Sequence, residues 1–325
     1  MGSVHAAAWR QCGATLAGIH AQDHPAAVEL ARREGTAAFE SLDALLESSD
    51  VIDVCAPTHL HRQFTEIAAK AGKHVICEKP IALTTLDGEA MIRACEQAGV
   101  RLFIAMVVRF FPQYQRAWEV VKSGGIGPPS VARFSRISYP PSGRGDNWFA
   151  DEARSGGMLL DLMIHDFDAA RWFSGEVKRV YAQRAPYPAG DVREYALVTL
   201  HHANGSLSLV EGGWAGPPGL FRTGFEVAGP GGVVEWSSDA PPSVLAFLDE
   251  TKGGPAAVGL PPAALGTDPY ALEIAHVHAA LESGAPFAVT PHDALQAVRI
   301  ALAARESSKS GQPVKLSPNT LEVQP

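Results

Sequence analysis

The first third of the chain alternates between short apolar runs and longer segments with helical spacing. The apolar runs are ATLAGIHA, SSDVIDVCAP, HVICEKP and RLFIAMVVRF, and the segments between them are HPAAVELARREG, HRQFTEIAAKAGK and TTLDGEAMIRACEQAGV. Strand runs that are apolar on both sides are typical of a parallel sheet with helices on both faces. The alternation predicts a doubly wound α/β domain over residues 1–110.

After Pro112 the pattern changes. A helical segment, QYQRAWEVVKSG, leads into a series of strand-like runs, which are VARFSRISY, REYALVTLHH, GSLSLVEGGWA, GFEVAGP and GGVVEW. Strands in series with few helices between them indicate an antiparallel sheet. We therefore expect a second domain of α+β type over residues 111–325, closed by helices near 270–283 and 292–310. The Pro/Gly-rich stretch 241–269 is expected to form a surface loop.

Composition narrows the functional class. The 325 residues are 46% hydrophobic and 19% charged, as in ordinary soluble proteins, and the net charge of −8 argues against a nucleic-acid partner. The sequence contains no run of 18 apolar residues, so we expect no membrane span. Its first residues also lack the basic-then-apolar pattern of a secretory signal. The four cysteines lack metal-type spacing, so we expect reduced, structural thiols, no metal site and a cytoplasmic location.

The segment HVICEKP places Glu78 and Lys79 at the carboxyl end of a buried strand, where open α/β sheets bind their ligands. Pro80 restricts Lys79 to extended geometry. A lysine in such a cleft can take part in proton transfer, whereas the alternative is a surface lysine paired with Glu78.

The segment SGGMLLDLMIHDFDAARWFSG predicts one apolar helix with a polar column. Asp161, His165, Asp168 and Trp172 stand at i, i+4, i+7 and i+11, which places them on one helix face. Such a column either faces a functional site or contains an Asp–His pair that braces the helix.

Two further segments carry candidate binding groups. In CAPTHLH, Thr58 either caps the next helix or forms a cofactor shelf with Pro57 and His61. In GDNWFADEARSGG, the amide of Asn147 can bind hydroxyls, and the ring of Trp148 offers a face for a sugar or is a core or interface aromatic. Arg109 either reaches the cleft or pairs with an acid, and we leave it out of the site.

Taken together, these motifs resemble the Gfo/Idh/MocA family of oxidoreductases over nearly the whole chain. The resemblance rests on the Glu-Lys-Pro turn, on the Gly-Gly entry followed by Asp-x-x-x-His, on the Pro-Thr-x-x-His turn and on a closing Gly-x-Pro-Val. These motifs are Glu78-Lys79-Pro80, Gly156-Gly157 with Asp161 and His165, Pro57-Thr58 with His61, and Gly311-Gln312-Pro313-Val314.

The resemblance implies a Rossmann-type domain, an open-faced and mainly antiparallel second sheet, and hydride transfer between NAD or NADP and a sugar, inositol or related polyol. It implies that His165 accepts the hydroxyl proton, that Asp161 binds substrate or positions the base, and that Lys79 polarises the reacting oxygen or fixes the substrate. Whether Lys79 or His165 is the general base stays open. Gly2, Pro57, Thr58, His61, Glu78 and Lys79 are then the expected cofactor residues, and Lys79, Asn147, Trp148, Asp161 and His165 the expected substrate residues. A homodimer or homotetramer is also implied.

Two departures from the family pattern bear on the cofactor. The fingerprint G-x-G-x-x-G follows a first strand, and Gly2 aligns with its last glycine, so that strand and the first two glycines are missing from this Rossmann-type domain. A start codon assigned too late, a trimmed chain or loss of the element would each explain this, and we favour the first. An acid for the ribose is expected at 20–22, where the chain has His20-Ala21-Gln22, and the nearby Asp23 leaves a slight preference for NAD.

Two other functions remain open from the sequence. A sugar- or nucleotide-sensing protein could keep this fold without turnover, and a hydrolase could use the nicotinamide transiently. Loss of turnover but not of cofactor binding in Lys79→Ala is the expected signature of the dehydrogenase.

Overall fold

The computed structural model describes residues 1–141, 147–186, 192–239, 245–248, 258–259, 268–317 and 320–323. The chain forms two compact units, one of residues 1–110 with 267–294, the other of residues 111–266 with 295–325. The segment 267–294, which we expected in the second domain, therefore packs with the first unit. The stretch 241–269 lies largely outside the described residues.

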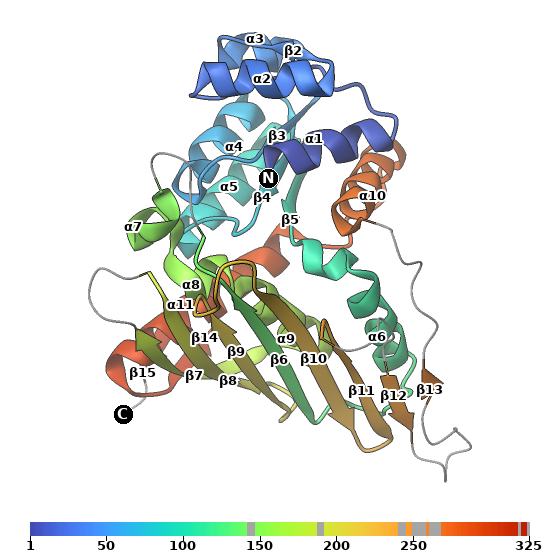
Figure 1. Cartoon of the computed structure of the whole chain (residues 1–325), viewed down its shortest axis with the longest axis vertical. Helices are drawn as coiled ribbons and strands as arrows, with labels where there is room; N and C mark the ends of the chain where they lie inside the picture. The colour runs from blue at the N-terminus through green and yellow to red at the C-terminus, as the bar shows by residue number, and fades with distance from the viewer. Residues whose placement is uncertain are drawn as a thin grey trace. The chain divides into compact units, whose positions relative to one another are not determined.

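The first unit contains parallel strands connected by helices (Figure 1). Its strands are β1 (Gly18–Ile19), β2 (Ala37–Ala38), β3 (Val51–Val54), β4 (His74–Glu78) and β5 (Leu102–Ala105). Its helices are α1 (Gly2–Gln11), α2 (His24–Glu34), α3 (Leu42–Glu47), η1 (Thr58–Leu60), α4 (His61–Lys70), α5 (Thr85–Ala98), η2 (Val107–Phe110) and α10 (Pro269–Ser283).

The parallel sheet of this unit is present in two pieces. Strands β3, β4 and β5 pair in that order with parallel register, while β1 pairs with β2 separately. Among the described residues no strand joins the two pieces, which agrees with a Rossmann-type sheet that lacks its first strand. Strand β4 is the buried centre of the larger piece, since Val75, Ile76 and Cys77 are at most 1% exposed.

Helix ends follow the expected local chemistry. The Asp23 carboxylate accepts the Ala26 N–H at 3.2 Å at the start of α2, and the Thr84 hydroxyl accepts the Asp87 N–H at 3.1 Å at the start of α5. Both helices end at a glycine in the left-handed region, Gly35 with φ +67° and Gly99 with φ +68°. These caps fix where each helix meets the edge of the sheet.

The second unit is built on a mainly antiparallel sheet. The described strands run in the order β13-β12-β11-β10-β6-β9-β8-β7-β14-β15, with only β6 and β9 parallel among the pairs with printed register. The strands are β6 (Val131–Ser138), β7 (Val177–Pro186), β8 (Glu194–His202), β9 (Leu207–Gly213), β10 (Phe221–Gly229), β11 (Gly232–Ser237), β12 (Leu245–Leu248), β13 (Val258–Gly259), β14 (Val314–Ser317) and β15 (Thr320–Val323).

Helices cover one face of this sheet. They are α6 (Pro112–Lys122), η3 (Trp148–Ala150), α7 (Glu152–Ser155), α8 (Gly157–Asp161), α9 (Ile164–Ser174) and α11 (Pro291–Ser310). Helix α9 packs on β6 and β9, and the strand residues beneath it, such as Phe134 and Val210, are at most 2% exposed. The alternate residues of β8 and β9 are more accessible, Leu197 being 55% and Leu209 42% exposed. The sheet is therefore open-faced, as expected. Within the described ranges the helices are too short or too polar to span a bilayer.

Candidate functional site

The Glu-Lys-Pro turn closes strand β4 of the first unit. Glu78 is the last strand residue and is 6% exposed, whereas Lys79 is half-buried and is joined to Pro80 by a cis peptide bond. The Glu78 carboxylate accepts the main-chain N–H of Lys79 at 3.1 Å through Oε2. The buried Glu78 side chain therefore fixes the main chain at Lys79.

His61 braces this turn. Its ring is 1% exposed, and Nδ1 and Nε2 lie 2.9 Å from the carbonyl oxygens of Pro80 and Ala56, respectively. Burial lowers the pKa of His61 despite the opposing effect of the two carbonyls, so the neutral ring donates to one of them. The His61 ring thus connects the loop after β3 with the turn that carries Lys79. This arrangement indicates that His61 supports the conformation of these two loops.

Thr58 lies at the carboxyl end of β3 but is not the cap that we considered. It is the first residue of η1, with Pro57 at the cap position, and no side chain caps either η1 or α4. Thr58 is 3% exposed. Gly2 comes to the same edge, because a Cβ on it would lie 3.7 Å from the Cβ of Cys55, directly after β3. Gly2, Pro57, Thr58 and the Glu78–Pro80 turn therefore share one edge of the sheet.

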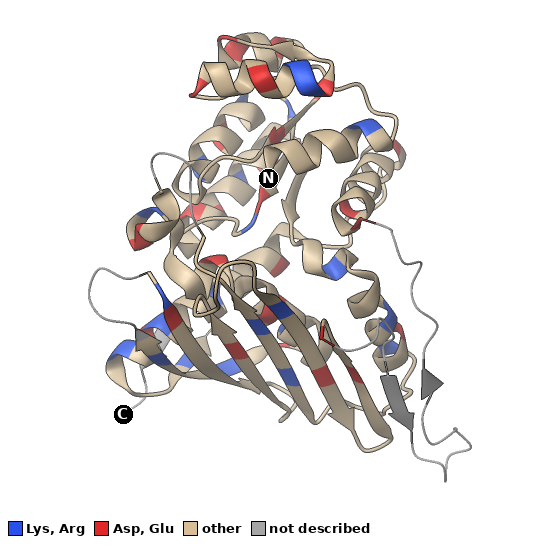
Figure 2. Ribbon diagram, viewed as in Figure 1, with Lys and Arg blue, Asp and Glu red and all other residues tan. Residues whose placement is uncertain are grey.

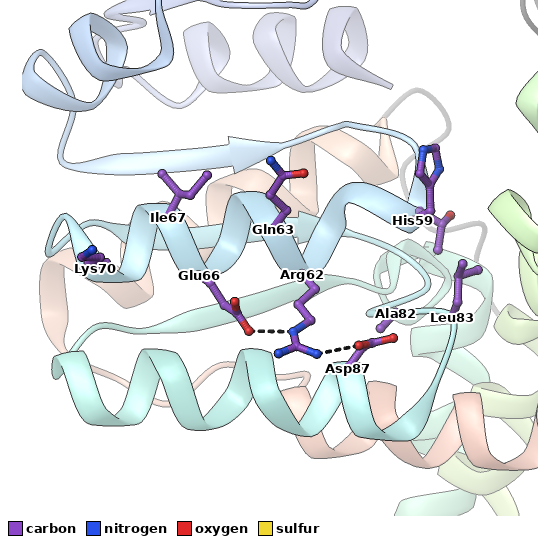
Figure 3. A pocket seen from close by; sticks show the side chains of 10 residues that line it. His59, Arg62, Gln63, Glu66, Ile67, Lys70, Ala82, Leu83 and Asp87 are labelled. Atoms are coloured by element: carbon purple, nitrogen blue, oxygen red, sulfur yellow. Dashed lines mark hydrogen bonds and ion pairs between the residues drawn. The ribbon is translucent and has the colours of Figure 1, made fainter.

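A polar groove of about 520 Å³ runs from this edge between α4 and the start of α5 (Figure 3). Its lining comprises Thr58, His59, Arg62, Gln63, Glu66, Ile67, Lys70, Ala82, Leu83 and Asp87. The Arg62 guanidinium is held between Glu66 at 2.7 Å and Asp87 at 2.8 Å, so its charge is already matched. Lys79 does not line this groove, and we assign no ligand to it.

In the second unit the predicted single helix is wrong, because it is broken. Helix α8 ends at Asp161 and α9 begins at Ile164, with Leu162 and Met163 between them. Both residues still donate to the Met158 carbonyl, at 2.9 and 3.1 Å, which widens the turn at this point. The break changes the angular relation between Asp161 and the residues of α9, so the four-residue column is not one helix face.

Exposure separates the members of that column. From residue 155 to residue 170 every residue is buried except Asp161 and His165. Asp168 is 1% exposed, and the ring of Trp172 lies 5.0 Å from that of Trp118. Of the acids and histidine in the column, only Asp161 and His165 are thus accessible.

An internal ion pair that the sequence did not reveal fixes the start of α9. Arg136 on β6 is 3% exposed, Asp166 is 0% exposed, and the guanidinium donates to Asp166 at 2.7 and 3.0 Å. Burial raises the pKa of Asp166, and Arg136 opposes that effect. Because Asp166 directly follows His165, this bidentate pair holds the main chain that carries His165. The signal that could have found it is an arginine in the middle of an alternating strand.

Asn147 and Trp148 lie together before α7. The Asn147 side chain donates to the Pro141 carbonyl at 3.5 Å, and the ring of Trp148 stacks on that of Phe149 with centroids 3.9 Å apart. One face of Trp148 is therefore covered. Arg109, which we left out of the site, is 8% exposed and lies 3.8 Å from Asp293, so the paired alternative describes it.

The residues of the first unit fit a dinucleotide at the shared sheet edge. Helix α1 begins there with no side-chain cap and no acid in its first turn, which leaves its N–H groups and positive dipole end for an anion such as a pyrophosphate. The two residues considered for the ribose already have contacts within the fold. Asp23 caps α2, and His20 lies 3.1 Å from the Phe39 carbonyl through Nδ1. The slight preference for NAD based on Asp23 stays a prediction, since only one oxygen of its exposed carboxylate accepts the capping N–H.

The four cysteines are free thiols, as expected. Cys55 also belongs, with His5 and Asp53, to a group in the described part of the chain whose potential metal-ligand atoms lie within 4.8 Å of one another. Burial and the nearby Asp53 carboxylate raise the pKa of the Cys55 thiol to about 12. Trp9 and His5 already contact the Asp53 carboxylate, at 2.8 and 2.9 Å. We interpret the group as a hydrogen-bonded cluster.

Three family models match the chain. They are an oxidoreductase family with an NAD-binding Rossmann fold over residues 1–106, the GFO/IDH/MocA C-terminal domain over 114–235, and an oxidoreductase-family C-terminal α/β domain over 265–316. The first match covers β1 to β5, and the other two fall mainly on the second unit and α10.

Named relatives extend over most of the chain. Myo-inositol 2-dehydrogenase of Thermotoga maritima is 32% identical over 82% of this chain and 80% of its own. Inositol 2-dehydrogenase of Rhizobium meliloti is 29% identical over 94% and 93%. The structure of levoglucosan dehydrogenase in complex with NADH and levoglucosan matches with a TM-score of 0.87 and 23% identity, over 97% of this chain and 96% of that one, which shows the shared fold. The chain belongs to the Gfo/Idh/MocA family of NAD(P)-dependent oxidoreductases.

Proposed function

We propose that this chain is a dehydrogenase that transfers a hydride between a nicotinamide dinucleotide and the hydroxyl-bearing carbon of a sugar, an inositol or a related polyol. The observation that carries this proposal is the accessibility of Asp161 and His165 in an otherwise buried run of residues. A hydroxyl that is oxidised needs a hydrogen-bond acceptor and a proton acceptor, and a carboxylate with an imidazole supplies both. The inositol dehydrogenases among the relatives support the polyol class.

In the oxidation direction the bound nicotinamide supplies the hydride acceptor. His165 takes the hydroxyl proton while the C–H bond breaks and the C–O bond becomes a carbonyl. Asp161 accepts a hydrogen bond from the substrate, and the Lys79 ammonium stabilises the negative charge that develops on the reacting oxygen. In the reduction direction the same groups return the proton. Lys79 as the general base is the alternative assignment.

Local contacts fix the main chain at Lys79 and the main chain next to His165. His61 and Glu78 hold the turn of Lys79 through contacts of 2.9 and 3.1 Å. The Arg136–Asp166 pair holds the residue next to His165. Catalysis by positioned groups depends on such supports, because a displacement of about 1 Å can lower the rate about 100-fold.

The test compares Lys79→Ala and His165→Asn with two matched controls. Lys73→Ala removes another half-buried lysine of the first unit, and His201→Asn removes another half-buried histidine of the second. We expect kcat to fall at least about 100-fold in the two site variants, because each loses a group that acts on charge or proton in the transition state. The controls should keep kcat, and all four should keep their affinity for the dinucleotide in calorimetric titrations.

Unchanged turnover in both site variants would overturn the assignment of the catalytic set. The pH profile of kcat/KM assigns the base, since the profile loses its low-pH limb only when the general base is replaced. Loss of that limb in Lys79→Ala rather than in His165→Asn would transfer the role to Lys79.

For the cofactor we propose NAD or NADP, with the choice left to competition between the two in the same titration. His20 stands where the ribose acid is expected and Asp23 just after it, and both have local contacts with the fold. An NADP preference would require a cation near the 2′-phosphate, and an NAD preference an acceptor near the 2′-hydroxyl.

We further propose that the outer face of the large sheet forms a homodimer or homotetramer interface. Its central strands carry the exposed residues Leu197 and Leu209, and Leu209 lies opposite Arg133 of the cross-strand pair Arg133–Glu226. Figure 2 shows acidic and basic residues together on the strands of this sheet. The register places Leu209 opposite Thr199 and hence diagonal to Leu197. Such a face can pair with a second copy of itself about a twofold axis.

The test is the mass by light scattering. Leu197→Glu with Leu209→Glu should yield a smaller species, whereas Leu86→Glu, at a 71% exposed position on α5 of the first unit, should leave the mass unchanged. A monomeric parent protein would contradict the interface. The four free thiols also support a cytoplasmic location, which cell fractionation tests.

A further inference from the structure

Four elements of the first unit direct one polar side chain each toward the same buried region. The residues are His5 on α1, Asp53 on β3, Glu78 on β4 and Glu273 on α10. His5, Glu78 and Glu273 are buried, at 1%, 6% and 0% exposed, whereas the Asp53 side chain is 17% exposed. A histidine with three carboxyl groups in one interior region is costly unless the charges are matched.

The contacts of His5 determine its protonation. Nδ1 lies 2.9 Å from Oδ2 and 3.1 Å from Oδ1 of Asp53, and Nε2 lies 3.0 Å from Oε1 of Glu78. The Nε2 contact is an ion-pair contact without the alignment of a full hydrogen bond. A neutral imidazole has one N–H, and its other nitrogen would present a lone pair to a carboxylate. Carboxylates at both nitrogens therefore favour the imidazolium.

The electrostatics point the same way. Burial by itself would lower the pKa of His5, but the Asp53 carboxylate and the contacts with Asp53, Cys55 and Glu78 raise it well above its ordinary value. In return, His5 and the Trp9 indole N–H lower the pKa of Asp53 against the opposing effect of burial. Asp53 and His5 thus form a charged pair inside the unit.

Glu78 connects this pair to the candidate catalytic turn. One carboxylate oxygen, Oε1, faces His5, and the other, Oε2, accepts the main-chain N–H of Lys79 at 3.1 Å. A continuous series of contacts hence runs from Asp53 through His5 and Glu78 to the main chain of Lys79. We call Asp53, His5 and Glu78 the buried relay.

Glu273 keeps the charge of this region in balance. Neither of its carboxyl oxygens has a hydrogen-bond partner among the described residues. Burial and the nearby Glu78 carboxylate raise the pKa of Glu273 well above its ordinary value, which favours its protonated form. The region then holds one cation and two anions rather than one cation and three anions.

We propose that His5 is a positioning residue for Lys79, because its ring fixes the Glu78 carboxylate against the Lys79 main-chain N–H. The inference rests on the proposed function only for its effect on turnover. Without the His5 ring, the Glu78 carboxylate would lose the cation beside Oε1, whereas Asp53 would keep its contacts with the Trp9 indole and the Cys55 thiol. The Glu78 side chain would then be less firmly fixed, and its hold on the Lys79 main-chain N–H would weaken.

The first measurement needs no activity and uses the unmodified full chain in buffer with EDTA. Nitrogen-15 NMR of the His5 ring should show both nitrogens protonated from pH 6 to pH 9. The Lys79 amide should exchange with solvent at a rate slowed by its Glu78 acceptor. A His5 ring with a single protonated nitrogen at pH 7 would overturn the proposal.

The second measurement compares His5→Gln with Glu273→Gln as the matched control. Glutamine at position 5 cannot bridge two carboxylates as a cation, so we expect the Lys79 amide to exchange at least tenfold faster relative to the Ile76 amide in the core of β4. We also expect kcat to fall about 10- to 100-fold while KM changes less than threefold. Glu273→Gln replaces an already neutral group outside the relay and should change neither quantity.

Unchanged Lys79 exchange in a folded His5→Gln protein would overturn the proposal. If that variant fails to fold, Asp53→Asn, which removes one anion of the relay, should shift the His5 ring resonances, and no shift would overturn it. The two hypotheses also fail separately. Faster Lys79 exchange without any effect of Lys79→Ala on turnover would keep the relay and refute the catalytic role of Lys79.

Discussion

Replacement of Glu273 by glutamine should stabilise the first unit at neutral and higher pH. The carboxyl group is fully buried, lacks a hydrogen-bond partner among the described residues and has a pKa raised well above its ordinary value of 4.5, chiefly by burial and then by Glu78. Glutamine is nearly isosteric with the protonated acid and does not titrate. The difference in free energy of unfolding between the parent and Glu273→Gln therefore measures the cost of keeping the Glu273 carboxyl group protonated in the folded state.

The sign follows from proton linkage. The folded-state pKa is raised, so above about pH 4.5 the unfolded chain releases a proton that the folded chain retains. The free energy of unfolding of the parent then falls by about 1.4 kcal/mol per pH unit until the folded-state pKa is reached. Inside this window the difference in stability between the parent and Glu273→Gln grows with every pH unit.

Trp9 offers a local probe, because the other tryptophans of the chain lie in the second unit and Trp9 donates to Asp53 within the same region. Fluorine NMR of 5-fluorotryptophan protein in urea would follow its signal at pH 4, 5.5 and 7.5. We expect equal stability at pH 4 and a difference that grows with pH. Parallel curves for the two proteins would refute the reasoning, since they would mean that Glu273 is ionised in the folded state.

Three further outcomes are expected. Asp166→Asn should lower the free energy of unfolding of the second unit by about 3 kcal/mol, because it leaves Arg136 buried without its anion, and the double variant Arg136→Met with Asp166→Leu should recover more than half of the loss in guanidinium unfolding. Cys55 should stay unmodified by iodoacetamide at pH 8 in peptide mass spectrometry, since a thiol with a pKa of about 12 is almost wholly protonated there, and its rapid labelling in the folded protein would contradict the cluster. Gly156→Ala should destabilise the entry to α8 by at least about 1–2 kcal/mol, because Gly156 has φ +82° and a Cβ there would lie 2.8 Å from the Cβ of Leu160, and an unchanged melting temperature would contradict that strain.

The sequence predicted the parallel and antiparallel parts of the fold because each leaves a local pattern. Strand β4 reads as a continuous apolar run that ends at Glu78, and β8 reads as an alternation, so burial on two faces or one is visible in the residues themselves. The sequence did not predict strand β7. Its residues, VKRVYAQRAP, include charged side chains on the accessible face of the strand and also among the positions of the buried face. Its pairing with β8 and β14 is a long-range property.

The candidate site divides in the same manner. The family resemblance proposed Lys79, Asp161 and His165, whose roles stay predictions, and it pointed to the Gly-Gly entry, whose glycines have the left-handed conformation in the structure. Spacing could not predict the break at Leu162 and Met163, because both residues are ordinary helix formers.

The buried relay was not accessible from sequence either. Its members are separated by many residues, and Glu273 comes from a helix that we placed in the other domain. From local sequence Thr58 could cap the next helix or form a cofactor shelf, and the structure excludes the cap, whereas Asp23, considered for the ribose, caps α2. Neighbouring polar residues compete for the same local roles, and only packing decides between them.

Isotope transfer tests the central claim most directly. The purified chain would be incubated with NAD⁺ or NADP⁺ and with inositols and aldoses deuterated at their hydroxyl-bearing carbons, and the reduced cofactor would be analysed by mass spectrometry. Direct hydride transfer predicts a reduced cofactor that carries one deuterium from at least one of these substrates, and no such product from Lys79→Ala or His165→Asn under the same conditions. Reduced cofactor without deuterium, or no reduction with saturable dinucleotide binding, would contradict a dehydrogenase and favour a sensing protein or transient use of the nicotinamide.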